Sequence, residues 1–165
     1  MRYTIILLTI IFFSCGKKKE INHPNFGVVI NVGTKKVSYD LTFGFSPTAT
    51  DGYDHGIDRY APPPPPPVFF DAALRKDGER YYSQILNGNV NDLIEHIWDI
   101  DLQFSSENQI ILKWNPGSLK GLGKFYLQDA FDGSQINVDM TKEKKLTITN
   151  PAHKKVKIKV TPIAS

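Results

Sequence analysis

The sequence contains a single cysteine, Cys15, so no disulfide bond can form within the chain. Neither sign of charge predominates: the formal net charge is only +3, and the positive excess lies largely in the lysines at positions 17–19. A charge this weak and this local does not provide the broad basic surface that nucleic-acid binding needs. The sequence therefore predicts no nucleic-acid partner.

Catalytic motifs are missing as well. Neither Gly-x-Ser-x-Gly nor His-Glu-x-x-His occurs, and the four histidines stand apart along the chain: His23, His55, His96 and His153. We expect His96, at the start of a strand, to lie on its solvated face. Asp99 and Asp101 share one side of an alternating run, which suits an acid–base pair, but a solvated strand face has the same pattern. We predict that the protein is not an enzyme.

Long apolar runs are limited to the N-terminus. Arg2 precedes an apolar stretch from Ile5 to Phe13, and Ser14 and Cys15 follow it. The stretch is short for a transmembrane helix and suits the core of a signal peptide. It resembles a bacterial lipoprotein signal of the kind found in the Bacteroidota, which is cleaved before a cysteine that then carries acyl chains. The resemblance implies a signal peptide over residues 1–14, lipidation at Cys15 and a place in the cell envelope, at the outer membrane.

Residues 15–25 are polar and form a predicted tether between the lipid and the rest of the chain. Fully extended, such a segment reaches at most roughly 40 Å, so the domain stays close to the membrane. Its lysines either contact anionic head groups or are simply solvated, and both interpretations remain open.

From Phe26 onward, apolar residues alternate with polar ones in short runs separated by Gly, Pro, Asn and Asp turns. The runs cover residues 27–32, 36–45, 96–104, 109–114, 124–129, 135–140, 145–149 and 155–160. This pattern predicts an all-β fold, an antiparallel β-sandwich of immunoglobulin-like general architecture, as a single domain over residues 26–165. Trp98 and Trp114 fall on its apolar side, and residues 89–95 form at most one or two helical turns.

Six consecutive prolines, residues 62–67, interrupt this pattern. They predict a polyproline II rod of roughly 19 Å, about the length of a strand. Too little chain precedes the rod to fold alone, so we expect an ordered crossing within the domain, with Val68 to Leu74 as the following strand and a turn at Asp77-Gly78. A docking peptide for another protein is the alternative.

The segment from Leu41 to Leu74 resembles a recurring module of secreted proteins of the Bacteroidota, often associated with type IX secretion. Its shared parts are Leu-Thr-Phe-Gly, Ala-Thr-Asp-Gly-Tyr-Asp, Gly-Ile-Asp, the proline cluster and Phe-Asp-Ala. The resemblance extends over roughly residues 36 to 162 and implies a β-module at the cell surface, with no particular chemistry.

Two sets of residues are candidates for binding. Asp51, Asp54 and Asp58 lie in one loop and would suit a calcium ion, or they cap backbone amides in turns. Five tyrosines are candidates for stacking on a flat ligand such as a sugar: Tyr53, Tyr60, Tyr81, Tyr82 and Tyr126.

We therefore expect an envelope lipoprotein with a non-catalytic module in a structural or protein-interaction role, its partner being another envelope protein. The alternative is a module that binds a surface glycan or other ligand. No cofactor is expected unless calcium stabilises the acidic loop.

Overall fold

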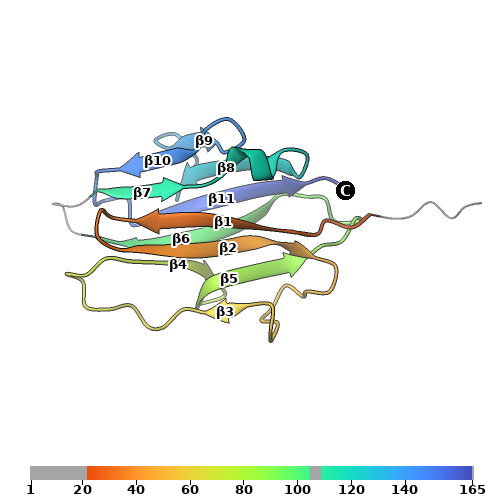
Figure 1. Ribbon diagram of the computed structural model, residues 1–165, viewed down its shortest axis with the longest axis horizontal. Helices are drawn as coiled ribbons and strands as arrows, with labels where there is room; N and C mark the ends of the chain where they lie inside the picture. The colour runs from red at the N-terminus through yellow and green to blue at the C-terminus, as the bar shows by residue number, and fades with distance from the viewer. Residues whose placement is uncertain (1–21, 105–108, 165) are drawn as a thin grey trace, which may run out of the picture.

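The computed structural model describes residues 22–104 and 109–164. The fold is all-β, as predicted, with about half of the described residues in strands (Figure 1). The strands are β1 (Phe26–Gly33), β2 (Ser38–Ser46), β3 (Arg59–Tyr60), β4 (Asp71–Lys76), β5 (Glu79–Asn87), β6 (His96–Gln103), β7 (Ile110–Lys113), β8 (Gly123–Asp129), β9 (Asn137–Asp139), β10 (Lys145–Ile148) and β11 (Lys155–Pro162), and a 3-10 helix, η1 (Pro116–Leu119), follows β7.

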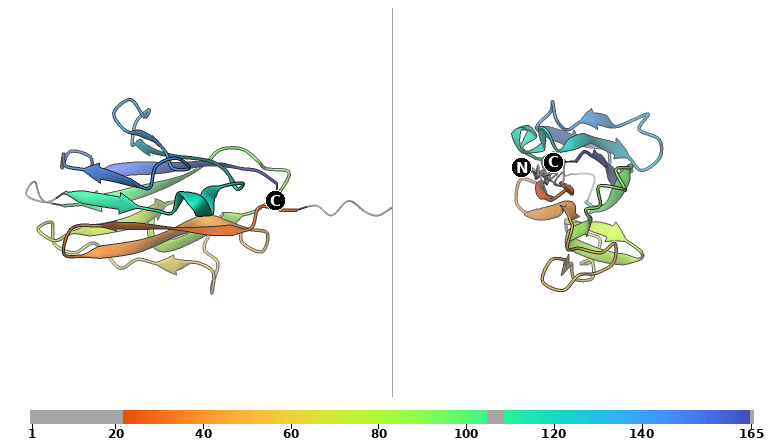
Figure 2. Two further views of the ribbon diagram at one scale, coloured as in Figure 1. Left: turned by 45° about the horizontal axis from the view of Figure 1, so that its top comes forward. Right: turned by 90° about the vertical axis from the view of Figure 1, so that its right-hand side faces the viewer.

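These strands form one sheet in the order β10-β7-β1-β2-β5-β4-β6-β11-β8-β9, with β3 added to β5. The sheet is nearly closed into a barrel-like sandwich, which the end-on view of Figure 2 shows. Pairs are antiparallel except for one: β2 and β5 run parallel, with Thr42 opposite Ser83 and Phe45 opposite Leu86. The parallel pair requires a long crossover, which the acidic loop, β3, the proline segment and β4 provide.

The core is built from the inward side of each alternating strand. In β1, Val28, Ile30 and Val32 are buried, and in β6 Trp98, Ile100 and Leu102 are buried. Both tryptophans are core residues, as predicted, since Trp98 is 0% exposed and Trp114 is 7% exposed.

His96, predicted on the solvated face of its strand, instead packs edge-on against Phe45, with ring centroids 4.9 Å apart. It shares the inward side of β6 with Trp98, and its neighbour Ile97 takes the exposed position. The prediction was wrong because His96 lies two residues before Trp98, and residues two apart in a strand point to the same face of the sheet.

The segment Val68–Leu74, predicted as a strand, is a strand only from Asp71, where β4 starts. Residues 67–69 turn, with the Phe69 amide donating to the Pro66 carbonyl, and Val68 and Phe69 are exposed. β4 then pairs with β5 around Asp77-Gly78, where both residues have positive φ, as a two-residue hairpin turn requires.

Residues 89–95 contain a turn rather than a helix, with the Asp92 amide donating to the Asn89 carbonyl. No helix within residues 22–104 and 109–164 is long and apolar enough to cross a membrane.

Candidate functional site

The outer edge of β5 is covered by residues 51–61, which run alongside it. Asp51 accepts a hydrogen bond from the Asn87 amide at 3.2 Å, and Asp58 accepts one from the Ile85 amide at 2.8 Å. β3 then pairs with the next part of β5, and the Ala61 amide donates to the Arg80 carbonyl at 2.9 Å. Carboxylates thus take the place of strand carbonyls, so an edge that would otherwise expose free amides is protected.

The acidic loop therefore holds its carboxylates on amides rather than around a common point. Asp54 accepts from the amide and the hydroxyl of Thr50, and Asp58 also accepts from the Asp54 amide. In the part of the chain that the structure describes, no group of three His, Cys, Asp or Glu side chains could hold a metal ion. The contacts match the amide-capping interpretation, and calcium binding stays a prediction.

Three of the five candidate tyrosines come together in one stack. The rings of Tyr53 and Tyr60 are parallel within 2° with centroids 4.3 Å apart, and Tyr60 stacks on Tyr81 at 5.0 Å. Tyr53 and Tyr60 are 41% and 46% exposed, whereas Tyr81 is buried. We call these three residues the tyrosine stack; it presents a flat aromatic surface that is fixed to the sheet through β3.

The other two candidates lie elsewhere. Tyr82 projects from the opposite side of β5 and stacks on Tyr39 with centroids 5.6 Å apart, while the Arg59 guanidinium lies 5.3 Å from the Tyr82 ring centre. Tyr126 stands on the outer face of β8, opposite Lys159 and Asp139 of the neighbouring strands. The two therefore do not contribute to the tyrosine stack.

Burial, and then the contact with Tyr60, raises the pKa of Tyr81 to about 12. The pKa of this hydroxyl in the unfolded chain is about 10, so the neutral hydroxyl contributes its full stabilisation of the folded state below pH ~10. We expect this contribution to be lost as the pH rises from about 10 through 12, which alkaline unfolding followed by circular dichroism will detect. Tyr81→Phe removes the ionisable group, so the stability of this variant should fall less steeply between pH ~10 and 12 than that of the unchanged protein. Identical alkaline curves for the two proteins would contradict the expectation.

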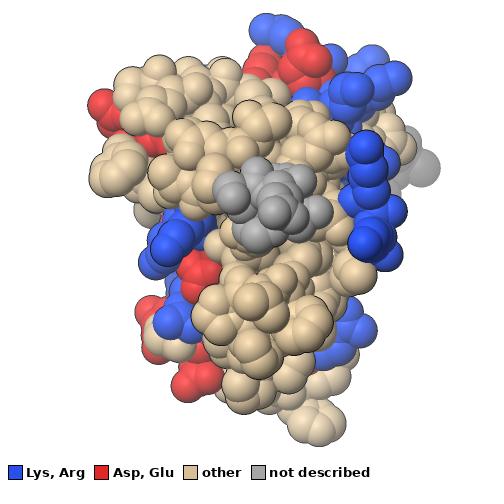
Figure 3. All heavy atoms as spheres, turned by 90° about the vertical axis from the view of Figure 1, so that its left-hand side faces the viewer, with Lys and Arg blue, Asp and Glu red and all other residues tan. Residues whose placement is uncertain are grey.

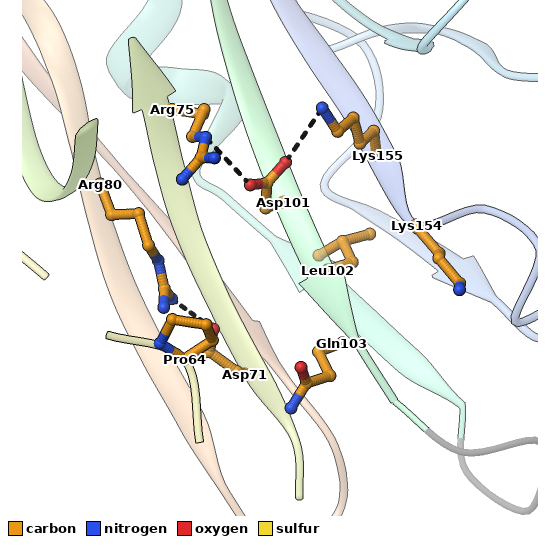
Figure 4. Close-up of a pocket in the computed structure, with 9 residues that line it drawn as sticks. All are labelled: Pro64, Asp71, Arg75, Arg80, Asp101, Leu102, Gln103, Lys154 and Lys155. Atoms are coloured by element: carbon orange, nitrogen blue, oxygen red, sulfur yellow. Dashed lines mark hydrogen bonds and ion pairs between the residues drawn. The ribbon is translucent and has the colours of Figure 1, made fainter. Parts of the chain in front are cut away.

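Beside the stack, a pocket of about 270 Å³ is lined by Tyr60, Ala61, Pro63, Arg75, Gly78, Glu79 and Arg80. A second pocket of about 270 Å³ lies next to the first and is shown in Figure 4. Its lining residues come from the rod, β4, β5, β6, the start of β11 and the residue before β11: Pro64, Asp71, Arg75, Arg80, Asp101, Leu102, Gln103, Lys154 and Lys155. Arg75 and Arg80 thus belong to both pockets.

Ion pairs order the second pocket. Arg80 forms a buried ion pair with Asp71, and Asp101 lies between Arg75 at 3.5 Å and Lys155 at 3.6 Å. Asp99 is exposed and lies opposite Lys157 in the sheet, so the carboxylate pair Asp99 and Asp101 belongs to a solvated, charge-paired strand face.

The rod is held over this pocket by one side chain. Gln103 donates from Nε2 to the carbonyls of Pro65, Pro66 and Phe69 at 3.0–3.1 Å. Five of the six prolines are nonetheless exposed, since only Pro65 is partly buried.

The sequence did not indicate the charged residues of this pocket. Arg75 and Arg80 lie directly opposite each other across the β4–β5 hairpin, a pairing that follows from the turn at Asp77-Gly78. Asp71, Gln103 and Lys155 join them only because β4 pairs with β6 and β6 with β11. The hairpin turn was the one available signal.

No family model, curated protein or solved structure matches the chain. The site is therefore interpreted from its own chemistry.

Proposed function

We propose that this protein is an envelope-anchored lipoprotein whose β-sandwich is a non-catalytic module that binds carbohydrate through the tyrosine stack. The observation that carries the proposal is the parallel pair Tyr53 and Tyr60, both partly exposed, with Tyr53 in the loop before β3 and Tyr60 on β3, where it stacks on the buried Tyr81. Exposed aromatic faces are suited to the apolar faces of sugar rings, and a fixed ring loses little conformational entropy on binding.

Polar groups next to the stack favour a sugar over a purely apolar ligand. Arg75 and Glu79 line the pocket that contains Tyr60, so hydroxyl groups of a ring stacked there find both donors and acceptors. Arg80, which lines the same pocket, forms a buried ion pair with Asp71.

The carbohydrate proposal is tested with Tyr53→Ala. We expect the detergent-solubilised full chain to bind a subset of a glycan array and Tyr53→Ala to lose about fivefold in affinity, since a stacked ring contributes on the order of 1 kcal/mol. Tyr126→Ala is the matched control, because Tyr126 is similarly exposed, at 37%, and lies on β8. Equal losses in both variants would remove the proposal.

The membrane anchor is a separate part of the proposal. Cys15 lies outside the described residues, and β1 begins at Phe26 after the predicted tether. We expect Cys15→Ala to lose metabolic palmitate labelling and to leave the detergent phase, because stable anchoring requires the acyl chains. Tyr53→Ala, expressed in the same cells, should keep both properties. Labelling of Cys15→Ala at the level of the unchanged protein would exclude the lipoprotein interpretation.

A protein partner is the second candidate, and the exposed rod favours it. Val68 and Phe69, directly after the prolines, are 76% and 58% exposed, so an apolar turn continues the rod at the surface. Aromatic-lined grooves bind such preformed polyproline segments. An envelope protein that co-purifies with the full chain, and is lost in a Phe69→Ser variant but not in Tyr53→Ala, would establish this alternative.

A further inference from the structure

We propose that the ligand is an acidic polysaccharide, and that a continuous groove extending from the tyrosine stack binds its anionic groups. The inference rests on the proposed carbohydrate function and names the class of sugar. The groove is defined by three consecutive pockets that share lining residues, and its two ends are Tyr60 and Phe131.

The pockets connect through four cationic side chains. Arg75 and Arg80 line both the pocket at Tyr60 and the pocket of Figure 4. Lys154 and Lys155 line the pocket of Figure 4 and also the third, a space of about 210 Å³ that ends at Phe131. Each junction between neighbouring pockets is therefore marked by two positive charges.

The carboxylates of the groove do not cancel these charges fully. Asp71 pairs with Arg80, and Asp101 is shared between Arg75 and Lys155. Within residues 22–104 and 109–164, Lys154 has no ion pair, and Nε and Nη1 of the buried Arg80 have no hydrogen-bond acceptor. Glu79 is the acidic side chain at the tyrosine end, so the positive excess lies towards Lys154 and Lys155.

The far end of the groove carries a second exposed aromatic ring. Phe131 is 79% exposed, and its loop is anchored by the buried carboxylate of Asp129, which accepts from the amides of Phe131, Gln135 and Ile136 at 2.9–3.1 Å. These amides, that of Ile136 foremost, hold the pKa of Asp129 well below its usual range, so the anchor stays ionised at neutral pH.

This arrangement fits a linear chain better than a small anion. Aromatic rings stand at both ends and cations occupy the middle, so sugar rings of one chain stack at the ends while its acid groups meet the cations between them. Figure 3 shows the end of the molecule where β6 ends, with Lys and Arg side chains on both flanks and Asp and Glu side chains interspersed among them on one flank. Carboxylate sugars and sulfated sugars share the required chemistry.

The experiment compares three polymers against the detergent-solubilised full chain at low salt. They are polygalacturonate, its methyl ester, which has the same backbone without the charge, and dextran sulfate. We expect polygalacturonate or dextran sulfate to bind about tenfold more tightly than the ester, and the tighter of the two identifies the acid group. Added salt should weaken binding of the acidic polymers and leave the ester unaffected.

The paired variant Lys154→Gln with Lys155→Gln tests the groove itself, and we expect it to reduce affinity for the acidic polymer about tenfold. Its matched control is Lys113→Gln with Lys145→Gln, because these two exposed lysines lie opposite each other on β7 and β10 and remove the same charge. Equal binding of acid and ester, or equal losses in the two paired variants, would overturn the inference and leave the carbohydrate function standing. Failure of every polymer and every arrayed glycan to bind would overturn both.

Discussion

Trp98→Ala should lower the free energy of unfolding by about 3–5 kcal/mol, because removal of a large buried ring leaves a cavity that the sheet cannot fill. The ring is fully buried, and its centroid lies 5.5 Å from that of Phe43 and 5.3 Å from that of Phe45. It therefore joins β6 to β2 across the interior of the barrel-like sandwich. Urea denaturation followed by far-ultraviolet circular dichroism measures the change.

Two phenylalanine variants serve as controls for the indole nitrogens. Nε1 of Trp98 has no hydrogen-bond partner among the described residues, whereas Nε1 of Trp114 donates to the Met140 carbonyl at 2.8 Å. We expect Trp114→Phe to cost about 1 kcal/mol for the lost hydrogen bond beyond the packing change, and Trp98→Phe to cost packing alone. If Trp98→Ala lowers the free energy of unfolding no more than Trp98→Phe does, the Trp98 ring does not join β6 to β2 and the prediction is wrong.

Deletion of Pro62 to Pro64 should destabilise the whole domain. The deletion shortens the rod by about 9 Å. Its two ends are fixed, since Tyr60 of β3 and Leu74 of β4 both pair with Tyr81 of β5. The two-residue β3 is held less firmly to β5 than β4 is. We therefore expect β3 to detach from β5, which would separate Tyr60 from Tyr81 in the tyrosine stack.

The expected loss is about 2–3 kcal/mol from the hydrogen bonds and ring contacts of β3, or a melting temperature lower by roughly 5–10 °C. Replacement of the same prolines by alanine keeps the length, so that variant should retain the tyrosine signal in near-ultraviolet circular dichroism. A deletion variant with unchanged melting temperature and tyrosine signal would mean that the rod is a tether or a docking peptide.

Alternation along the chain was sufficient to predict most strands and their buried sides. Val28, Ile30 and Val32, or Val156, Ile158 and Val160, lie at every second position, and a strand places such residues on one face whatever its neighbours are. Strand neighbours were less accessible to sequence reasoning. β3 has only two residues and shows no period, and the parallel pairing of β2 with β5 depends on a crossover through residues 47–78.

The tertiary structure determined most of the candidate binding surface, because it brings the side chains of that surface together. The residue types of the tyrosine stack were candidates from the sequence alone, but Tyr53, Tyr60 and Tyr81 meet only because residues 51–61 lie along the edge of β5. Arg80, Asp101 and Lys155 are likewise brought together by pairing between strands far apart in the chain. Periodicity determines which face a side chain takes, because that depends on local backbone geometry. Which side chains become neighbours depends on strand order and register, and these arise from packing of the whole sheet.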